Sequence, residues 1–412
     1  MKSSIRGIAI GALTIGGAIG VSASSAADRP STENPFEVLG SPARPGSAEP
    51  FLAVAPDGRV YMTWLEPADS GTALRFATLS GSQWSAPRTI RAGRDFFVNW
   101  ADFPSIDVLD GRRLSVHWLQ RTGRTTYAYG VRIAQSNDGG STWSRPITPH
   151  RDTAQQEHGF VATWREDGRL GAVWLDGRKF AKQGHDMSNE MMLVSTTVLP
   201  NGSLGPEVRL DERTCDCCQN AAVMTSAGPV VAYRNPSADE IRDIYVTRRV
   251  AGKWTEGRAV HDDRWKIAAC PVNGPALAAN GADVALAWFT AAGDTARVQV
   301  AFSTNAGASF SKPVRIDGGN PAGRVDVVLL PDRSALVSWI ERTSGDTAAV
   351  RVRRVQSSGQ VGAPMTVATS SAARTSGFPK MVLSGTTALF AWTESGKPSA
   401  IRVARAPVSA LR

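Results

Sequence analysis

The sequence contains few cysteines, and this scarcity excludes the class of small proteins built on disulfides. Only 4 of its 412 residues are cysteine, which is too few to hold together a chain of this length. A hydrophobic core must therefore stabilise the fold.

The sequence also lacks clustered basic residues. The formal net charge is +9, but the arginines are scattered singly along the chain. Binding to nucleic acid needs basic side chains gathered on one surface, so we expect no nucleic-acid partner. The charge suits simple solubility as well as it suits attraction to anionic glycans.

Long hydrophobic runs are missing beyond the first residues, so we expect no membrane span in the mature protein. The beginning of the chain has the pattern of a signal peptide at residues 1–27: Lys2 and Arg6 precede a short apolar run, and small residues follow up to Ala27. The alternative is an uncleaved anchor. Export to the periplasm or the extracellular space follows from the first interpretation, and disulfides persist in both places.

A repeat organises the remainder of the chain. A short apolar strand that ends in a large aromatic residue recurs roughly every fifty-five residues; these residues are Trp64, Trp118, Trp174, Tyr233, Trp288, Trp339 and Trp392. Each aromatic residue follows a turn and precedes a polar loop and a further strand. The simplest role for these aromatic side chains is packing between repeats.

This pattern predicts an all-β fold, a β-propeller of four-stranded antiparallel blades, with one domain over residues 28–412. Seven blades are favoured, and six with an irregular extra unit are the alternative. The last repeat ends without a clear fourth strand. Residues 34–40, NPFEVLG, resemble such a strand, so we expect them to close the ring.

A family resemblance rests on SNDGGSTW, residues 136–143, and on a weaker copy, STNAGASF, at residues 303–310. The first matches the Asp-box of the bacterial neuraminidase (BNR) repeat, so the chain resembles the propellers of the sialidase superfamily. The resemblance implies a structural turn on the face away from the active site. The residues that would form it are Ser136, Asp138, Gly140, Thr142 and Trp143.

The same resemblance implies sialidase chemistry, for which the sequence offers an incomplete set of residues. The family's first arginine is absent where Glu49 stands, although Arg324 and Arg374 can supply two members of an arginine triad. Asp102 and Glu157 are candidates for a catalytic acid and base. An exo-sialidase-type glycoside hydrolase is therefore an alternative function rather than the leading one.

Alignment of the repeats predicts that further polar residues gather around the mouth of the central channel. In a propeller, the loops that precede first strands and the loops that follow second strands lie on this face. The candidate ligand-binding residues are Glu49, His158, Asp176, Arg178, Arg242 and Glu341, and the loop after Asp176 adds His185 and Asp186.

The cysteines Cys215, Cys217, Cys218 and Cys270 belong to this face, and three interpretations stay open for them. Cys217 or Cys218 can form a disulfide with Cys270, which would join neighbouring blades. The four thiols can instead bind a soft metal ion, copper or zinc, with His158 in reach. The third interpretation is redox chemistry.

The sequence therefore predicts an exported propeller that binds a glycan, another small molecule or a soft metal ion at the channel mouth. A scaffold that docks a protein partner is a further alternative.

Overall fold

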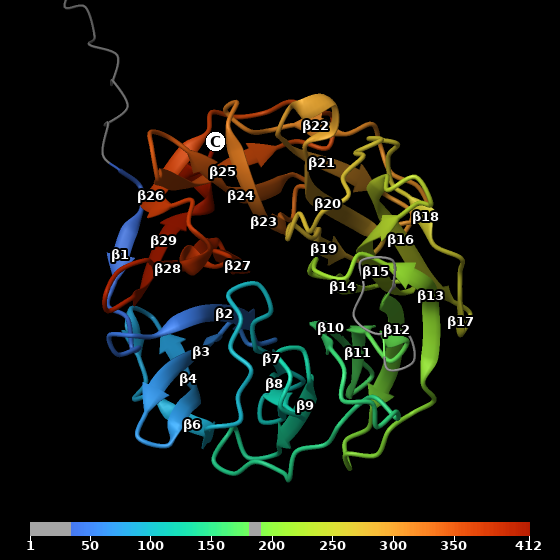
Figure 1. Cartoon of the computed structure of the whole chain (residues 1–412). Coiled ribbons are helices and arrows are strands. Elements are labelled where there is room, and N and C mark those ends of the chain that lie inside the picture. The colour runs from blue at the N-terminus through green and yellow to red at the C-terminus, as the bar shows by residue number, and fades with distance from the viewer. Residues whose placement is uncertain (1–33, 181–190) are drawn as a thin grey trace, which may run out of the picture. The chain divides into compact units, whose positions relative to one another are not determined.

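The computed structural model describes residues 34–180 and 191–412, and Pro35–Arg412 form one compact unit. Its strands form seven antiparallel sheets around a centre, as Figure 1 shows. The all-β fold and the prediction of seven blades are confirmed. No helix in the described part of the chain has the length and apolar character needed to cross a membrane. The expected signal peptide lies outside the described residues.

The first three blades contain β2 to β13. Blade 1 consists of β2 (Ala48–Val54), β3 (Val60–Ala68), β4 (Gly71–Ser80), β5 (Gln83–Trp84) and β6 (Arg88–Gly93). Blade 2 consists of β7 (Ser105–Val108), β8 (Leu114–Arg121) and β9 (Tyr129–Ser136). Blade 3 consists of β10 (His158–Glu166), β11 (Arg169–Asp176), β12 (Met191–Val198) and β13 (Val208–Thr214).

Blades 4 to 6 continue in the same order. Blade 4 consists of β14 (Ala221–Thr225), β15 (Gly228–Pro236), β16 (Arg242–Val250), β17 (Lys253–Trp254) and β18 (Arg258–Ala259). Blade 5 consists of β19 (Ala276–Asn280), β20 (Asp283–Thr290), β21 (Arg297–Ser303) and β22 (Val314–Arg315). Blade 6 consists of β23 (Pro321–Leu329), β24 (Ala335–Arg342), β25 (Thr347–Val355) and β26 (Met365–Ser371).

Blade 7 joins the two ends of the compact unit. It consists of β27 (Lys380–Ser384), β28 (Thr387–Glu394), β29 (Ala400–Pro407) and β1 (Glu37–Leu39), which pairs with β29 at the sheet edge (Figure 1). In this pairing Glu37 lies opposite Arg405 and Leu39 opposite Val403. The predicted closure of the ring by residues 34–40 is confirmed.

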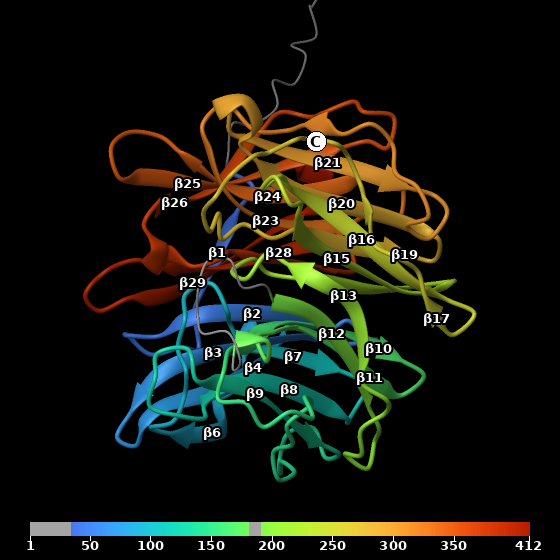
Figure 2. The ribbon, with the colours of Figure 1, turned by 45° about the vertical axis from the view of Figure 1, so that its right-hand side comes forward.

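Three blades depart from the four-stranded expectation, because blades 1 and 4 each divide their outer strand into two short pieces. Blade 2 has three strands, and its fourth strand is reduced to a single bridge between Ile133 and Ile147. The short 3-10 helices η1 (Ala292–Asp294), η2 (Arg374–Ser376) and η3 (Val408–Ala410) lie outside the sheets. Figure 2 shows the same blades from the side.

The recurring aromatic residues lie on the second strand of each blade and are buried, as predicted. Several of them donate the indole N–H to a carboxylate two residues later on the same strand. Trp64 donates to Glu66 over 2.9 Å and Trp174 to Asp176 over 2.9 Å; Trp339 donates in the same way to Glu341. The acid that follows the tryptophan therefore satisfies a buried donor.

The Asp-box residues form the expected turn between β9 and the Ile147 bridge. Asp138 accepts hydrogen bonds from the Thr142 amide and hydroxyl over 2.9 and 2.6 Å. Gly140 has a φ of 81°, and a Cβ there would lie 2.5 Å from the Phe76 ring. Trp143 packs edge-on against the same ring. The contacts predicted for Asp138 are therefore present, and they are structural.

Candidate functional site

The first strands of three blades begin at the channel mouth with a β-bulge. At each bulge one non-glycine residue takes a positive φ: Glu49 at 59°, Phe160 at 51° and Arg324 at 58°. A side chain from the preceding blade accepts a hydrogen bond from the backbone N–H of that residue. The acceptors are Thr393 for Glu49, Asp102 for Phe160 and Asn273 for Arg324. Bulges re-aim side chains, and here they also join neighbouring blades.

The bulges of blades 1 and 3 bring several acids together below the mouth. Burial and the neighbouring Glu157 raise the pKa of Asp102 to about 8, although the Phe160 N–H lowers it. Burial, assisted by Asp102, raises the pKa of Glu49 well above its usual value. Both carboxyl groups therefore hold protons at pH values where an exposed acid is ionised.

Tyr129 is the partner of Glu157 that we did not predict from the sequence. Its hydroxyl donates to Glu157 Oε1, and its ring is fully buried and stacked on Phe97 at 3.8 Å. Burial and the nearby carboxyl groups raise its pKa further above 10. Burial therefore keeps the Tyr129 phenol protonated, with its proton directed at the Glu157 carboxylate.

Arg324, predicted as one member of an arginine triad, makes most of its contacts within the fold. Its guanidinium is buried and donates to backbone oxygens of Ala372, Ala373 and Gly377 and to Ser376 Oγ. These donors hold the segment that leads into blade 7. Burial, with Arg342 and Arg374 nearby, lowers the pKa of Arg324 to about 10. The structure therefore brings three arginines together but engages Arg324 in the fold.

A cleft of about 490 Å³ is lined in part by Trp100, which two of these arginines contact. Residues from blades 1, 2 and 7 line it, among them Glu49, Trp100, Thr375, Thr393, Ser395 and Lys397. Trp100 is half-buried and stacks on Phe378 at 5.8 Å. The guanidinium groups of Arg324 and Arg374 lie over its ring at 4.9 and 5.9 Å. Trp100 lies outside the repeat, so the sequence pattern did not mark it.

Three of the predicted ligand-binding residues are engaged by neighbouring side chains instead. Asp176, besides accepting from Trp174, pairs with Arg178 over 2.6 Å. Arg178 also pairs with Glu207 over 2.8 Å. Glu341 accepts from Trp339 and from the Asn320 amide. These partners follow from one cause, because buried polar atoms are nearly always hydrogen-bonded, and the ligand-binding role of the three residues stays a prediction.

His158 is grouped with His150 and Asp152 rather than with the cysteines. Its Nδ1 lies 3.0 Å from the Gln156 carbonyl and its Nε2 lies 2.9 Å from Asp152. Both acceptors require a ring N–H, so the imidazole is the protonated form. Burial opposes this charge, but Asp152 and Asp176 outweigh it and raise the pKa of His158 to about 9. His185 and Asp186 lie outside the described residues.

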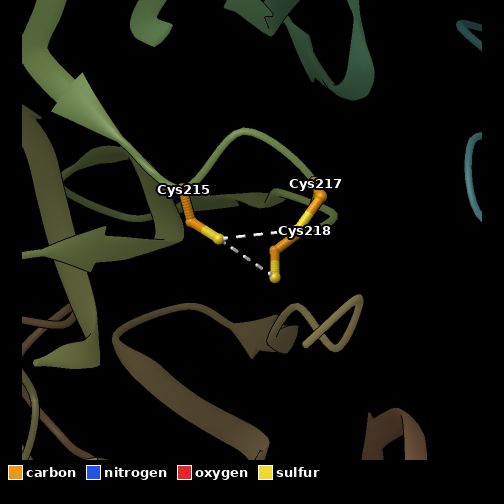
Figure 3. Close-up of side chains that lie close together, drawn as sticks. All are labelled: Cys215, Cys217 and Cys218. Carbon is orange, nitrogen blue, oxygen red and sulfur yellow. Dashed lines mark hydrogen bonds between the residues drawn. The ribbon is translucent and has the colours of Figure 1, made fainter. Parts of the chain in front are cut away.

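The cysteines do gather at the mouth, between blades 4 and 5. The sulfur of Cys215 lies 3.8 Å from that of Cys217 and 3.5 Å from that of Cys218 (Figure 3). Cys270 lies beside Asp216 and Cys217, with ligand atoms within 4.8 Å of one another. All four cysteines are free thiols in the structure. Arg242 donates to Cys215 over 3.3 Å, so this predicted residue belongs to the cysteine cluster.

Below the mouth, a cavity of about 190 Å³ lies among the first strands of the blades. Asp102, Asp107, Asp326 and Lys380 are among its lining residues. The Lys380 ammonium lies 4.1 Å from the centre of the Phe103 ring. Asp326 interacts with Lys380, so these opposite charges compensate each other within the wall.

No protein-family model matches the sequence, and no curated protein sequence matches it. Solved structures do match. An ulvan lyase of polysaccharide lyase family 25, bound to a GlcA–Rha3S saccharide, aligns with 90% of this chain and 96% of its own, at 12% identity and a TM-score of 0.58. An α-L-arabinanase of Penicillium chrysogenum with arabinobiose aligns with 89% of this chain and 95% of its own, at 12% identity and a TM-score of 0.50.

A NanB sialidase variant of Streptococcus pneumoniae aligns with 92% of this chain and 71% of its own, at 12% identity and a TM-score of 0.46. The chain shares its β-propeller fold with the ulvan lyase and the arabinanase. At 12% identity this likeness is one of fold alone.

Proposed function

We propose that the protein binds a carboxylate-bearing saccharide in the cleft beside Trp100. The observation that carries this proposal is the pairing of an aromatic ring with positive charge on one open surface. Trp100 offers a half-buried ring, and the exposed Arg374 lies against it. An aromatic face packs against the apolar face of a sugar ring, and a guanidinium binds a carboxylate through two parallel hydrogen bonds.

The charges around the cleft favour an acidic rather than a neutral sugar. Arg342 and Arg374 are exposed, and both lie near enough to Arg324 to lower its pKa. Within residues 34–180 and 191–412, neither exposed arginine has a carboxylate partner. The hydroxyl groups of Thr375 and Ser395 lie 3.1 Å apart at the cleft and supply neutral hydrogen-bonding groups.

The solved structures of the same fold give this proposal a chemical precedent. The ulvan lyase holds a saccharide that contains glucuronate, and the arabinanase holds a neutral arabinose disaccharide. The arginines of the present cleft favour the first kind of ligand. We further propose that the protein is exported, because residues 1–27 have the charged start and short apolar run of a signal peptide. Export would bring the protein to an extracellular polysaccharide.

Binding of defined oligosaccharides tests the proposal. Glucuronate-containing oligosaccharides and neutral arabino-oligosaccharides are titrated into the mature protein, with calorimetry as the readout. We expect the acidic series to bind and to weaken as salt is added. Trp100→Ala and Arg374→Gln should each weaken binding by about tenfold or more.

Arg145→Gln is the matched control, because Arg145 is exposed in the Asp-box turn, on the opposite face of the blade. It should leave affinity unchanged. Equal affinity for both sugar series, or wild-type binding by Arg374→Gln, would contradict the proposal. Release of shorter saccharides during the titration would add a cleavage activity to the binding function.

A further inference from the structure

The three cysteines of residues 215–218 lie in a tight turn that leads from β13 into β14. The turn is held at both sides. The Cys215 amide donates to the Arg234 carbonyl over 2.9 Å, and Gln219 accepts from the Gly274 amide over 3.0 Å. A Cβ on Gly274 would lie 2.0 Å from the Gln219 carbonyl oxygen, so blade 5 packs tightly against the turn. The sulfur positions are therefore set by the backbone of two blades.

The spacing of the sulfur atoms matches that of thiolates around one metal ion. Figure 3 shows the three side chains converging, with Cys215 at 3.5 and 3.8 Å from the other two sulfurs. A zinc–sulfur bond of about 2.3 Å places tetrahedral ligands about 3.8 Å apart. A disulfide requires a sulfur separation of about 2.05 Å. The observed distances fit the first arrangement and not the second.

Two arginines place positive charge beside the turn. Arg234 is buried, and its guanidinium donates only to carbonyl oxygens, among them those of Asn273 and Phe289. Within the described residues no carboxylate pairs with it. A buried cation needs a compensating anion. Arg242 similarly donates to Cys215.

One ligand atom from each of the three cysteines lies within 4.8 Å of the other two, so a single ion can contact all three sulfurs. A thiolate is the form of cysteine that binds metals.

We propose that Cys215, Cys217 and Cys218 form a binding site for one soft metal ion, Zn²⁺ or Cu⁺. Soft thiolate ligands select these ions over Mg²⁺ or Ca²⁺. The site is distinct from the Trp100 cleft, to which none of these cysteines contributes. Cys270 is exposed and is grouped with Asp216 and Cys217 but not with Cys215 and Cys218, so it is not one of the three proposed ligands.

The test measures bound metal on the full mature chain. The protein is reduced, stripped with a chelator without oxygen, loaded with Zn²⁺ or with Cu⁺ in separate samples, and passed through a desalting column. We expect about one ion per chain. The two samples, compared by competition with chelators of known affinity, decide which ion the site prefers. X-ray absorption of the loaded wild-type protein should show three sulfur ligands.

Variants then assign the ligands. Cys215→Ser and Cys218→Ser should lose the bound ion, whereas Cys270→Ser should keep it. A serine at either buried position can disturb folding, so the fold of each variant is checked by circular dichroism. The number of sulfur ligands measured by X-ray absorption comes from the wild-type protein and does not depend on the variants. The proposal is overturned if the protein binds neither Zn²⁺ nor Cu⁺. It is also overturned by loss of the ion in Cys270→Ser, or by a mass two hydrogens lower after purification together with a peptide map that assigns the disulfide to two of the three proposed ligands.

Discussion

Asp102 shows at the scale of one residue how a fold changes the chemistry of a side chain. It lies below the channel mouth and accepts a hydrogen bond from the backbone N–H of Phe160 on the next blade. Burial raises its pKa from 3.8 to about 8. Its proton is therefore bound more tightly in the folded chain than in the unfolded chain. The resulting stability is complete below pH 4 and is lost as the pH rises to about 8.

Asp102→Asn should remove this part of the pH dependence. The amide oxygen still accepts from the Phe160 N–H, while the side chain stays neutral at every pH. We expect the variant to match the wild type near pH 4 and to be the more stable protein near pH 9. Urea unfolding across this range measures the difference. Parallel pH curves for the two proteins would contradict the assigned ionisation.

Asp110→Asn is the control with the opposite sign. Hydrogen bonds from the Arg112 and Arg113 amides lower the pKa of Asp110 to about 2. Its ionised form is therefore favoured by folding, and that stability is present above the unfolded pKa and lost as the pH falls toward 2. The variant should be less stable than the wild type at neutral pH and should approach it in acid.

Residue types alone did not reveal which polar groups were free to bind a ligand. Asp176 and Glu341 were predicted at the mouth and do lie at the ends of second strands, but each accepts from the tryptophan two positions before it. The spacing of tryptophan and acid was visible in the sequence. The hydrogen bond between them depends on the side-chain rotamers of the tryptophan and the acid, which only the structure shows.

At the scale of one element, β1 is attached to the ring mainly through a single buried side chain. Leu39 is 6% exposed and packs with Leu52 and Val403, whereas its neighbour Val38 is 71% exposed. Phe36 adds an edge-on contact with Phe390. The strand is short, so its attachment depends on this packing more than on its hydrogen bonds.

Leu39→Asp should lower the free energy of unfolding by about 3 kcal/mol, because it places a carboxyl group in an apolar cluster. Val38→Asp, one position away, should change it by less than about 0.5 kcal/mol. Chemical denaturation of both variants measures the difference. Equal effects of the two substitutions would show that β1 is not packed as described.

At the scale of the whole molecule, the closed ring gives every blade two neighbours. Open repeat arrays need terminal caps, but here β1 and β29 join the ends of the chain within one sheet. The bulges at the mouth add further links, because Asp102, Asn273 and Thr393 each bond to the next blade. Loss of one blade therefore exposes the faces of two others.

We expect the mature protein to unfold in one cooperative transition and to give no stable fragment of fewer blades under limited proteolysis. Leu39→Asp should move this transition to lower temperature without splitting it, since closure supports the ring as a unit. Calorimetry compares the two proteins. Two separated transitions in the wild type would show that the blades unfold as independent groups.

The sequence by itself determined the architecture, since a repeat of constant length must bury equivalent residues in equivalent places. The buried tryptophans, the seven blades, the Asp-box turn and the closing strand all followed from spacing along the chain. It also placed Cys217 and Cys270 near each other, because both lead into first strands of adjacent blades.

Only the tertiary structure decided which polar groups were already engaged. Arg324 is held by backbone carbonyls of the next blade, Tyr129 is paired with Glu157, and His158 is paired with Asp152. Trp100 became a candidate because residues from three blades form a cleft around it. These outcomes depend on side-chain directions and on contacts between blades, and position along the repeat does not specify distances of a few ångströms in space.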